Sequence, residues 1–368
     1  MSDPANLKHT PLESAHVACG ARMVEFGGWY MPVQYSGIID EHKAVRSASG
    51  MFDISHMGEV TVEGPGALAW LESLLTNRVG KLAVTRGQYT LMLDEKGGVI
   101  DDLIIYRTGE MSYFLVINGA CRDLDLEWMR SRLPADGSVV LKDQGNDYAA
   151  IALQGPDSEK ILRSLYPDCE VPKRNGIATL IETVPLPSLV ARTGYTGEDG
   201  FELFVPVAAG VALWESLIAA GVKPCGLGSR DTLRLEMGYP LNGSDLSRER
   251  TPLEAGLDRF TGLDDPEKGD FSGRSALELQ RAAGLPSRLV PLKLTVSGPP
   301  MRSHYAVFAG DALIGETCSG ALSPSMGEGI AMAYLPSAHA VPGATVEIEV
   351  RGRRYPATIS TLPFYKKP

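Results

Sequence analysis

Two adjacent carboxylates, Asp101 and Asp102, stand in the middle of the otherwise apolar stretch GGVIDDLIIYR. The β-branched and large apolar residues around them are typical of a β-strand, and the glycine pair before them is typical of a turn. Because successive strand residues face opposite sides of a sheet, Asp101 shares one apolar face with Leu103, and Asp102 shares the other with Ile104. An unpaired buried charge is strongly unfavourable. The pattern therefore predicts that one of these carboxylates has a chemical task.

Three further polar side chains stand out against apolar or glycine-rich surroundings. Asn118 ends the strand SYFLVIN, and Glu202 lies inside GFELFVP on the same face as Phe204. Arg230 lies in the glycine-rich turn of CGLGSRDTLRLEMGYP, close to the expected start of a helix. Each has a simple structural explanation, such as a turn cap or an ion pair between Arg230 and Asp231. Gathered in one cleft, perturbed carboxylates would indicate a functional site.

The sequence lacks the common signatures of nucleotide, metalloprotease and hydrolase sites, namely GxGxxG, GxxxxGK[ST], HExxH and GxSxG. Its six histidines show no ligand spacing, and His56 in FDISHMGE is interpreted as structural. The five cysteines are odd in number and contain no CxxC, which argues against a disulfide framework and a zinc site. We therefore expect no metal, and the polar residues of the strands remain the candidates for chemistry.

Sheets must position these residues, and the first half of the chain supplies suitable elements. Residues 58–64 (GEVTVEG) predict a strand, and residues 66–76 predict an amphipathic helix with leucines at helical spacing. The stretches 87–93, 97–107 and 112–118 are apolar and are separated by short turns. This spacing predicts an antiparallel meander.

The same pattern then recurs. EVTVEGPGALAWLESLL from Glu59 resembles AAIALQGPDSEKILRSLY from Ala149, with Leu71 matching Leu162. Each is an apolar strand, then Gly-Pro, then a helix, and proline suits the first turn of a helix. Two such units about 90 residues apart predict a duplicated α+β domain with antiparallel sheets and a central cleft where the halves meet. Chance recurrence of a frequent strand–Gly-Pro–helix motif is the alternative.

The last part of the chain has a different composition. From Thr251 to about Leu285 it is polar and charged, and it ends in AAGLPSR, which is typical of a linker. Beyond this point, short alternating strands such as RLVPLKLTV, GIAMAYL and ATVEIEVRG are separated by Gly/Pro turns. They predict an all-β C-terminal domain, either a small barrel or a sandwich.

The bulk numbers limit the function class. The chain has 368 residues, 44% of them hydrophobic and 22% charged, as in an ordinary globular protein. No apolar run approaches the roughly 20 residues that span a bilayer, and MSDPANLKHTPLES has neither a secretory nor a transit pattern. We therefore expect a cytoplasmic protein. The net charge of −10 argues against a nucleic-acid partner, so an anion site would need a local basic pocket.

Six motifs in one order resemble the aminomethyltransferases, the T-proteins of the glycine cleavage system. They are MVEFGGWYMPVQY, FDISHMGEV, GGVIDDLIIYR, ARTGYTGEDGFEL, CGLGSRDTLRLEMGYPLNG and SPSMGEGIAMAYL, and the match runs from about Leu7 to Tyr365. The resemblance implies a duplicated folate-binding domain over residues 1–284 and a C-terminal β-barrel domain over residues 285–368. Both agree with the elements described above.

The resemblance also implies a tetrahydrofolate-dependent reaction with a protein partner. The lipoyl-bearing H-protein brings an aminomethyl group on a dihydrolipoyl sulfur, ammonia leaves, and the carbon passes to tetrahydrofolate as 5,10-methylenetetrahydrofolate. Asp101 matches the family's catalytic aspartate, which would polarise the attacking nitrogen and stabilise positive charge on the carbon. Asp102, on the opposite face of the strand, is interpreted as structural.

Glu202 matches the glutamate that recognises the pterin in this family. Its carboxylate would accept both parallel N–H groups of the 2-amino-pyrimidinone edge, which an amide cannot do. By the same matching, Arg230 would supply positive charge near the pterin, and Asn118 would supply hydrogen bonds. The remaining folate contacts implied by the resemblance are apolar and come from Tyr195, Val116 and Met57.

One position departs from the family pattern. Relatives commonly carry tryptophan where this chain has Arg259, in GLDRF. An aromatic wall beside the cofactor would then be absent, or replaced by Phe260 or by guanidinium stacking. Either Arg288 or Arg302 could meet the glutamate tail of the folate.

A basic cluster near the C-terminus could contact an acidic H-protein or the folate tail. Alternatively, it is a solvated edge that blunts strand pairing. We call it the C-terminal basic cluster; its members are Arg351, Arg353, Arg354, Lys366 and Lys367.

Two other functions fit parts of the sequence. One is a folate-dependent demethylase on the same scaffold, which would take a methyl or methylene group from a small methylated compound. The other is a folate-binding accessory protein without turnover. The presence of Asp101, Glu202 and Arg230 together favours the aminomethyltransferase.

Overall fold

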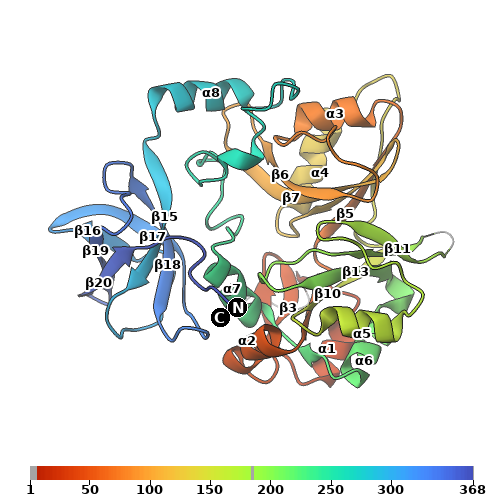
Figure 1. Cartoon of the computed structure of the whole chain (residues 1–368), viewed down its shortest axis with the longest axis horizontal. Coiled ribbons are helices and arrows are strands. Elements are labelled where there is room, and N and C mark those ends of the chain that lie inside the picture. The colour runs from red at the N-terminus through yellow and green to blue at the C-terminus, as the bar shows by residue number, and fades with distance from the viewer. Residues whose placement is uncertain (1–5, 184–185, 368) are drawn as a thin grey trace. The chain divides into compact units, whose positions relative to one another are not determined.

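The computed structural model describes residues 6–183 and 186–367, which form two compact units (Figure 1). The first unit consists of the described residues of Met1–Thr90 and Asp102–Arg230. The second consists of Leu91–Asp101 and the described residues of Asp231–Pro368. Within the described ranges, no helix is both long and apolar enough to cross a membrane.

The first unit begins with a small three-stranded sheet, in the order β1-β3-β2, that the sequence analysis did not predict. Strands β2 (Arg22–Phe26) and β3 (Trp29–Gln34) form an antiparallel hairpin. Gly27 and Gly28 close it with φ angles of 57° and 85°, which suit glycine. The Gly-Gly pair between two apolar runs was the local signal for this turn. The neighbouring elements are β1 (Lys8–His9), α1 (Glu13–Ala18), α2 (Ile38–Ser47) and β4 (Gly50–Asp53).

The same succession of elements then occurs twice: a strand, a helix, three strands, a helix and a strand. The first copy contains β5 (Gly58–Glu63), α3 (Ala67–Leu74), β6 (Gly87–Leu93), β7 (Val99–Gly109), β8 (Ser112–Ile117), α4 (Arg122–Ser131) and β9 (Val140–Asp143). The second contains β10 (Tyr148–Gln154), α5 (Ser158–Leu165), β11 (Ile177–Ile181), β12 (Ser188–Ala191), β13 (Gly200–Pro206), α6 (Val207–Ala219) and β14 (Lys223–Pro224).

The two sheets also share their strand order. The first is β6-β7-β8-β5-β9, and the second is β11-β12-β13-β10-β4-β14. Counted within each copy, both orders are second, third, fourth, first and fifth strand, with β4 added between the last two in the second sheet. The topology therefore supports the predicted duplication, since a chance motif would not reproduce a whole sheet.

The repeated Gly-Pro has the same physical cause in both copies. Gly64 and Gly155 have φ angles of 122° and 124°, which side chains rarely adopt. A Cβ on Gly64 would lie 2.4 Å from the carbonyl oxygen of Ser138, and one on Gly155 would lie 2.5 Å from that of Ala48. Both positions thus require glycine for backbone conformation and for close approach. The following proline then begins the turn into α3 or α5.

The second sheet has one face covered by helices, and its other face carries Glu202. Alternate residues of β10 and β13, including Ile151 and Leu203, join α1, α5 and α6 in one hydrophobic core around Trp214 (Figure 1). The opposite face carries Glu202 and Phe204, because strand residues alternate. This confirms that these two residues share a face.

Aromatic rings join that face to the first sheet. The ring centroid of Phe114 in β8 lies 5.2 Å from that of Phe204 and 6.0 Å from that of Tyr148, both in edge-to-face geometry. Tyr106 in β7 lies 6.5 Å from Phe114 and is fully buried. The two sheets of the first unit therefore pack on each other through aromatic residues. Glu202 lies on the same face as Phe204, two residues before it in β13.

The second unit ends in the β-barrel that the sequence predicted. Six strands close in the order β15-β18-β17-β16-β19-β20, every neighbouring pair is antiparallel, and β20 pairs with β15 to complete the ring. The inward residues, such as Leu292 and Ile348, form its core. The strands are β15 (Ser287–Leu294), β16 (Ala306–Ala309), β17 (Ala312–Leu322), β18 (Gly329–Pro336), β19 (Thr345–Val350) and β20 (Arg353–Ile359).

The polar segment from Thr251 to about Leu285 carried no predicted helix. It contains the 3-10 helix η2 (Asp258–Phe260) and the helix α8 (Arg274–Ala283). Leu277 of α8 is fully buried, while the rest of this helix is largely solvated, which explains the polar composition. Ahead of them, α7 (Leu227–Met237) carries Arg230.

Candidate functional site

Glu202 is held from one side by a short hydrogen-bonded chain in the first unit. The hydroxyl of Thr193 donates to Glu202 Oε2 at 2.7 Å, and the Tyr106 hydroxyl lies 2.8 Å from Thr193 Oγ1. Glu202 is only 8% exposed and lies opposite Ala152 of β10 in the sheet register. Thr193 therefore holds the carboxylate from one side.

The charges of Glu202, which is buried, and of Arg230, which is half-buried, act on each other. Burial raises the pKa of Glu202 above 4.5, against the hydrogen bond from Thr193 and the positive charge of Arg230, which both lower it. Burial also lowers the pKa of the Arg230 guanidinium from its usual value. The Arg230 guanidinium lies 4.9 Å from the ring centre of Tyr195. Glu202 and Arg230, which the sequence singled out, and Tyr195, which the family resemblance added, therefore belong to one electrostatic group.

Met57, Val116 and Asn118 gather where β5 and β8 run side by side. Val116 lies opposite Glu59, and Ile117 lies opposite Gly58, so that Met57 and Asn118 follow directly at the same end of the pair. Asn118 Nδ2 donates to the backbone oxygen of Asp102 at 2.8 Å and to its Oδ1 at 3.1 Å. This places the amide as a hydrogen-bonding group beside two apolar side chains.

His56 connects the two groups. It is buried, and burial together with the charge of Arg230 lowers its pKa to about 4, so the ring is neutral at physiological pH. Its ring packs against Phe26 and Trp29 at 6.1 and 6.5 Å between centroids. A Cβ on Gly119 would lie 2.2 Å from the His56 backbone oxygen, so the turn after Asn118 lies directly on this residue. The packing of His56 is compatible with a structural role, which stays a prediction, and its Nδ1 has no hydrogen-bond partner among the described residues.

Asp101 belongs to the second unit, with residues 91–101 and 231–368. Its side chain is fully buried, and Asn242 Nδ2 donates to its Oδ1 at 2.6 Å. Asp102 is half-buried and accepts from the Tyr89 hydroxyl at 2.9 Å in addition to Asn118. The alternation of β7 thus separates the two carboxylates as the sequence predicted.

Arg259, Arg288, Arg302 and the C-terminal basic cluster lie outside the groups described above. The Arg259 guanidinium lies 4.5 Å from the ring centre of Phe260, and the stacking of either group on the cofactor stays a prediction. Arg288 and Arg302 are exposed. In the C-terminal basic cluster, Arg354 lies 3.8 Å from the ring centre of Phe308 and 3.5 Å from a Glu347 oxygen, which neutralises part of its charge.

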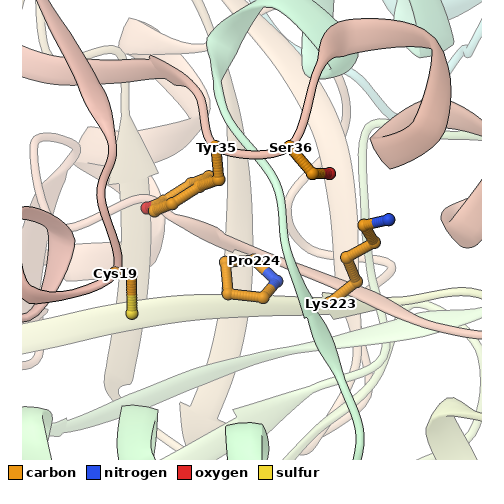
Figure 2. Close-up of a pocket in the computed structure, with 5 residues that line it drawn as sticks. All are labelled: Cys19, Tyr35, Ser36, Lys223 and Pro224. Atoms are coloured by element: carbon orange, nitrogen blue, oxygen red, sulfur yellow. The ribbon is translucent and has the colours of Figure 1, made fainter.

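A shallow pocket of about 240 Å³ lies elsewhere in the first unit (Figure 2). It contains none of the predicted site residues. Beneath it, the Tyr35 hydroxyl lies 3.0 Å from His16 Nδ1, and His16 Nε2 lies 2.8 Å from Asp53. This buried chain ties the N-terminal segment to β4. The lining residues of the pocket are Cys19, Tyr35, Ser36, Lys223 and Pro224.

Sequence reasoning missed several residues that support the site. Thr193 lies in the turn ARTGYTGEDG, and Tyr106 ends the apolar run of β7; nothing local distinguishes either residue as a partner of Glu202. Asn242 stands in an Asn-Gly pair, which signals a turn but no contact with Asp101.

Glu59 is a further buried carboxyl group of the first unit that the sequence did not single out. It is fully buried, and neither of its side-chain oxygens has a hydrogen-bond partner among the described residues. Burial raises its pKa well above 4.5, although the charge of Arg122 opposes this. We therefore expect Glu59 to be protonated in the folded protein where an exposed glutamate would be ionised.

Glu59→Gln is expected to raise the melting temperature, with a gain that grows from about pH 4.5 towards neutral. Because the folded pKa is raised, the unfolded chain ionises first, so the free energy of unfolding falls as pH rises until the folded pKa is reached. Glutamine removes this loss, and each kcal/mol corresponds to about 2–4 °C in a domain of this size. Calorimetry at several pH values measures it. Glu63→Gln, on the same strand but exposed, is the matched control; a gain that shrinks towards neutral pH contradicts the prediction.

The comparisons with known proteins agree over nearly the full chain. Residues 12–265 match the family model for the GCVT N-terminal domain, and residues 288–366 match that for the glycine cleavage T-protein C-terminal barrel domain. The chain is 45% identical to an aminomethyltransferase of Moorella thermoacetica over 376 aligned positions, covering 99% of each. It is 44% identical to one from Geobacillus kaustophilus over 366, covering 98% of this chain and 99% of that protein.

A solved structure gives the same result for the fold. The crystal structure of glycine cleavage system aminomethyltransferase T from Bartonella henselae is 32% identical in sequence, with a TM-score of 0.91 and 98% of each chain covered. The mixed α+β domain and the six-stranded barrel are therefore common to both proteins.

Proposed function

The chain belongs to the aminomethyltransferases of the glycine cleavage system, the T-proteins, and on that premise we propose its detailed reaction and site. It releases ammonia from the aminomethyl group on the dihydrolipoyl arm of the H-protein and transfers the methylene carbon to tetrahydrofolate. The products are ammonia, 5,10-methylenetetrahydrofolate and the dihydrolipoyl arm with both thiols restored. The observation that carries this proposal is the group in the first unit formed by the buried Glu202 and the half-buried Arg230 and Tyr195.

The donor and acceptor groups of this unit fit a pterin. Glu202 is an oriented carboxylate in a buried place, which suits two parallel N–H donors such as those of the 2-amino-pyrimidinone edge. Arg230 adds positive charge, and Tyr195 presents the ring over which that charge lies. Asn118 offers a polar group next to the apolar Val116 and Met57. Tetrahydrofolate, when bound, supplies the nitrogen atoms that accept the carbon.

Asp101 is proposed as the catalytic residue. A carboxylate that is fully buried and already holds an amide hydrogen bond cannot be screened by water, so its charge acts strongly on a nearby cationic centre. In this role it orients the attacking nitrogen and stabilises positive charge on the transferred carbon. Asp102 accepts hydrogen bonds from Asn118 and Tyr89, and its proposed role is to position the strand.

Three accompanying proposals follow from the same premise. The lipoylated H-protein is the partner, and the C-terminal basic cluster is a candidate contact with it. The protein acts in the cytoplasm. The domain boundary lies near residues 284 and 285, which is supported by the end of α8 at Ala283 and the start of β15 at Ser287.

Mixing the protein with tetrahydrofolate and aminomethyl-loaded H-protein is expected to give ammonia and 5,10-methylenetetrahydrofolate in equal amounts. Ammonia is measured enzymatically and the folate product by chromatography. H-protein without the lipoyl arm is the matched control and should give neither product. Turnover of small N-, O- or S-methyl donors, with none of the H-protein, would instead establish the demethylase.

A further inference from the structure

The side-chain amide of Asn242 donates one hydrogen bond to the proposed catalytic carboxylate and one to the backbone beside it. Its Nδ2 lies 2.6 Å from Asp101 Oδ1 and 3.0 Å from the backbone oxygen of Ile100. The same amide thus holds the side chain of one residue and the backbone of the residue before it. Both contacts lie within the second unit.

The orientation of this amide follows from its own oxygen. The backbone N–H of Gly243 donates to Asn242 Oδ1 at 2.9 Å. An amide oxygen only accepts and an amide NH₂ only donates, so this bond directs the NH₂ group towards Asp101. A flipped amide would put an oxygen against the carboxylate and lose all three hydrogen bonds.

The turn that carries Asn242 is anchored by a buried ion pair. Asp245 Oδ2 accepts from Arg234 Nη1 at 2.7 Å and from the backbone N–H of Leu241 at 2.9 Å. Gly243, with a φ of 84°, donates its N–H to the Leu246 oxygen as well. Asp245 and Arg234 are almost fully buried. The turn therefore has few conformations open to it.

The strand that carries Asp101 is joined to the same region by its backbone. The N–H of Val99 lies 3.0 Å from the carbonyl oxygens of both Ser247 and Arg250. A Cβ on Gly98 would lie 2.0 Å from the Arg248 oxygen, so the two segments approach as closely as glycine allows. The segments that carry Asn242 and Asp101 are thus joined by backbone hydrogen bonds and close packing.

We propose that Asn242 is a positioning residue that holds the Asp101 carboxylate in the single orientation the transfer requires. This rests on the proposed function of Asp101. A hydrogen bond to an ionised acceptor is stronger than a neutral one, and it fixes one carboxylate oxygen so that the group cannot rotate. Since small misplacements of a reacting group are costly, the amide contributes to the rate without contacting the substrate.

Asn242→Ala is expected to lower kcat about 10- to 100-fold, because a loosened carboxylate loses its orientation. The KM for tetrahydrofolate should stay within about threefold of the normal value, because Glu202 and Arg230, the residues proposed to bind the pterin, are unchanged. Steady-state kinetics with aminomethyl H-protein measures both. Ser244→Ala, an exposed change in the same turn, is the matched control and should keep normal activity.

A double-mutant cycle separates positioning from general destabilisation. In an Asp101→Ala background, Asn242→Ala should cause no further loss of the residual rate, since no carboxylate remains to be held. If Asn242→Ala does not fold, Asn242→Leu keeps a similar side-chain shape but has no donor, and it should show the same fall in kcat.

Equal losses in both backgrounds, or a kcat within twofold of normal for the folded Asn242 variants, would overturn the inference about Asn242 while leaving Asp101 as the proposed catalytic residue. Normal activity of Asp101→Ala itself would instead remove the proposed function of that residue. The two failures are therefore distinguishable.

Discussion

Asp101→Asn is expected to lower kcat about 10²- to 10⁴-fold, while the KM for tetrahydrofolate changes little. Asparagine has nearly the same shape as aspartate, so the change removes a charge and leaves the packing. The charge is lost from a fully buried place, where water cannot replace it. Its effect should therefore fall on the charged transition state rather than on cofactor binding.

Asp102→Asn, one residue further along β7, is the control for this measurement. It removes the same charge from the opposite face of the strand, where the side chain holds Asn118 and Tyr89. We expect it to raise the KM for tetrahydrofolate several-fold through Asn118, with a smaller effect on kcat. A kcat reduced equally by both changes would contradict a specific role for Asp101, as would an Asp101 variant with normal turnover.

Glu202→Gln is expected to weaken tetrahydrofolate binding about 100-fold, which corresponds to roughly 2.8 kcal/mol. One N–H acceptor becomes an amide donor, so a hydrogen bond to an ionised group is replaced by a clash of two donors. Calorimetric titration measures the Kd. Glu215→Gln, an exposed change of the same kind on α6, should leave the Kd unchanged.

The affinity should also depend on pH through this carboxyl group. Burial raises the pKa of Glu202 above 4.5, and only the ionised form accepts both N–H groups. Tetrahydrofolate affinity should therefore fall as pH is lowered through this raised pKa. The Glu202→Gln variant lacks the group, so it should lack that part of the dependence. An identical pH dependence in both proteins would exclude Glu202 from cofactor recognition.

Local patterns predicted much of the fold. The alternation in GGVIDDLIIYR and GFELFVP correctly separated the faces of β7 and β13. The recurring Gly-Pro correctly indicated a repeated unit, because Gly64 and Gly155 meet the same backbone constraint. Helix α8 was missed because polar composition does not distinguish an unstructured segment from a solvated helix with one buried residue, such as Leu277. The N-terminal sheet was missed although Gly27 and Gly28 marked its turn.

The chain's own order of residues determined which side chains stand in apolar strands, where the two copies and the barrel begin, and that Asp101, Glu202 and Arg230 are unusual. These properties depend on neighbours a few positions away, and strand and helix periods make them visible. Only the tertiary structure decided which residues are hydrogen-bond partners in the site. The hydrogen-bonded residues Thr193 and Tyr106 are 87 positions apart in the sequence, and Asn242 and Asp101 are 141 positions apart. No local period relates residues so far apart, because their contact is created by how the sheets and turns pack. For the same reason only the folded chain shows that Glu59 is buried without a hydrogen-bond partner among the described residues.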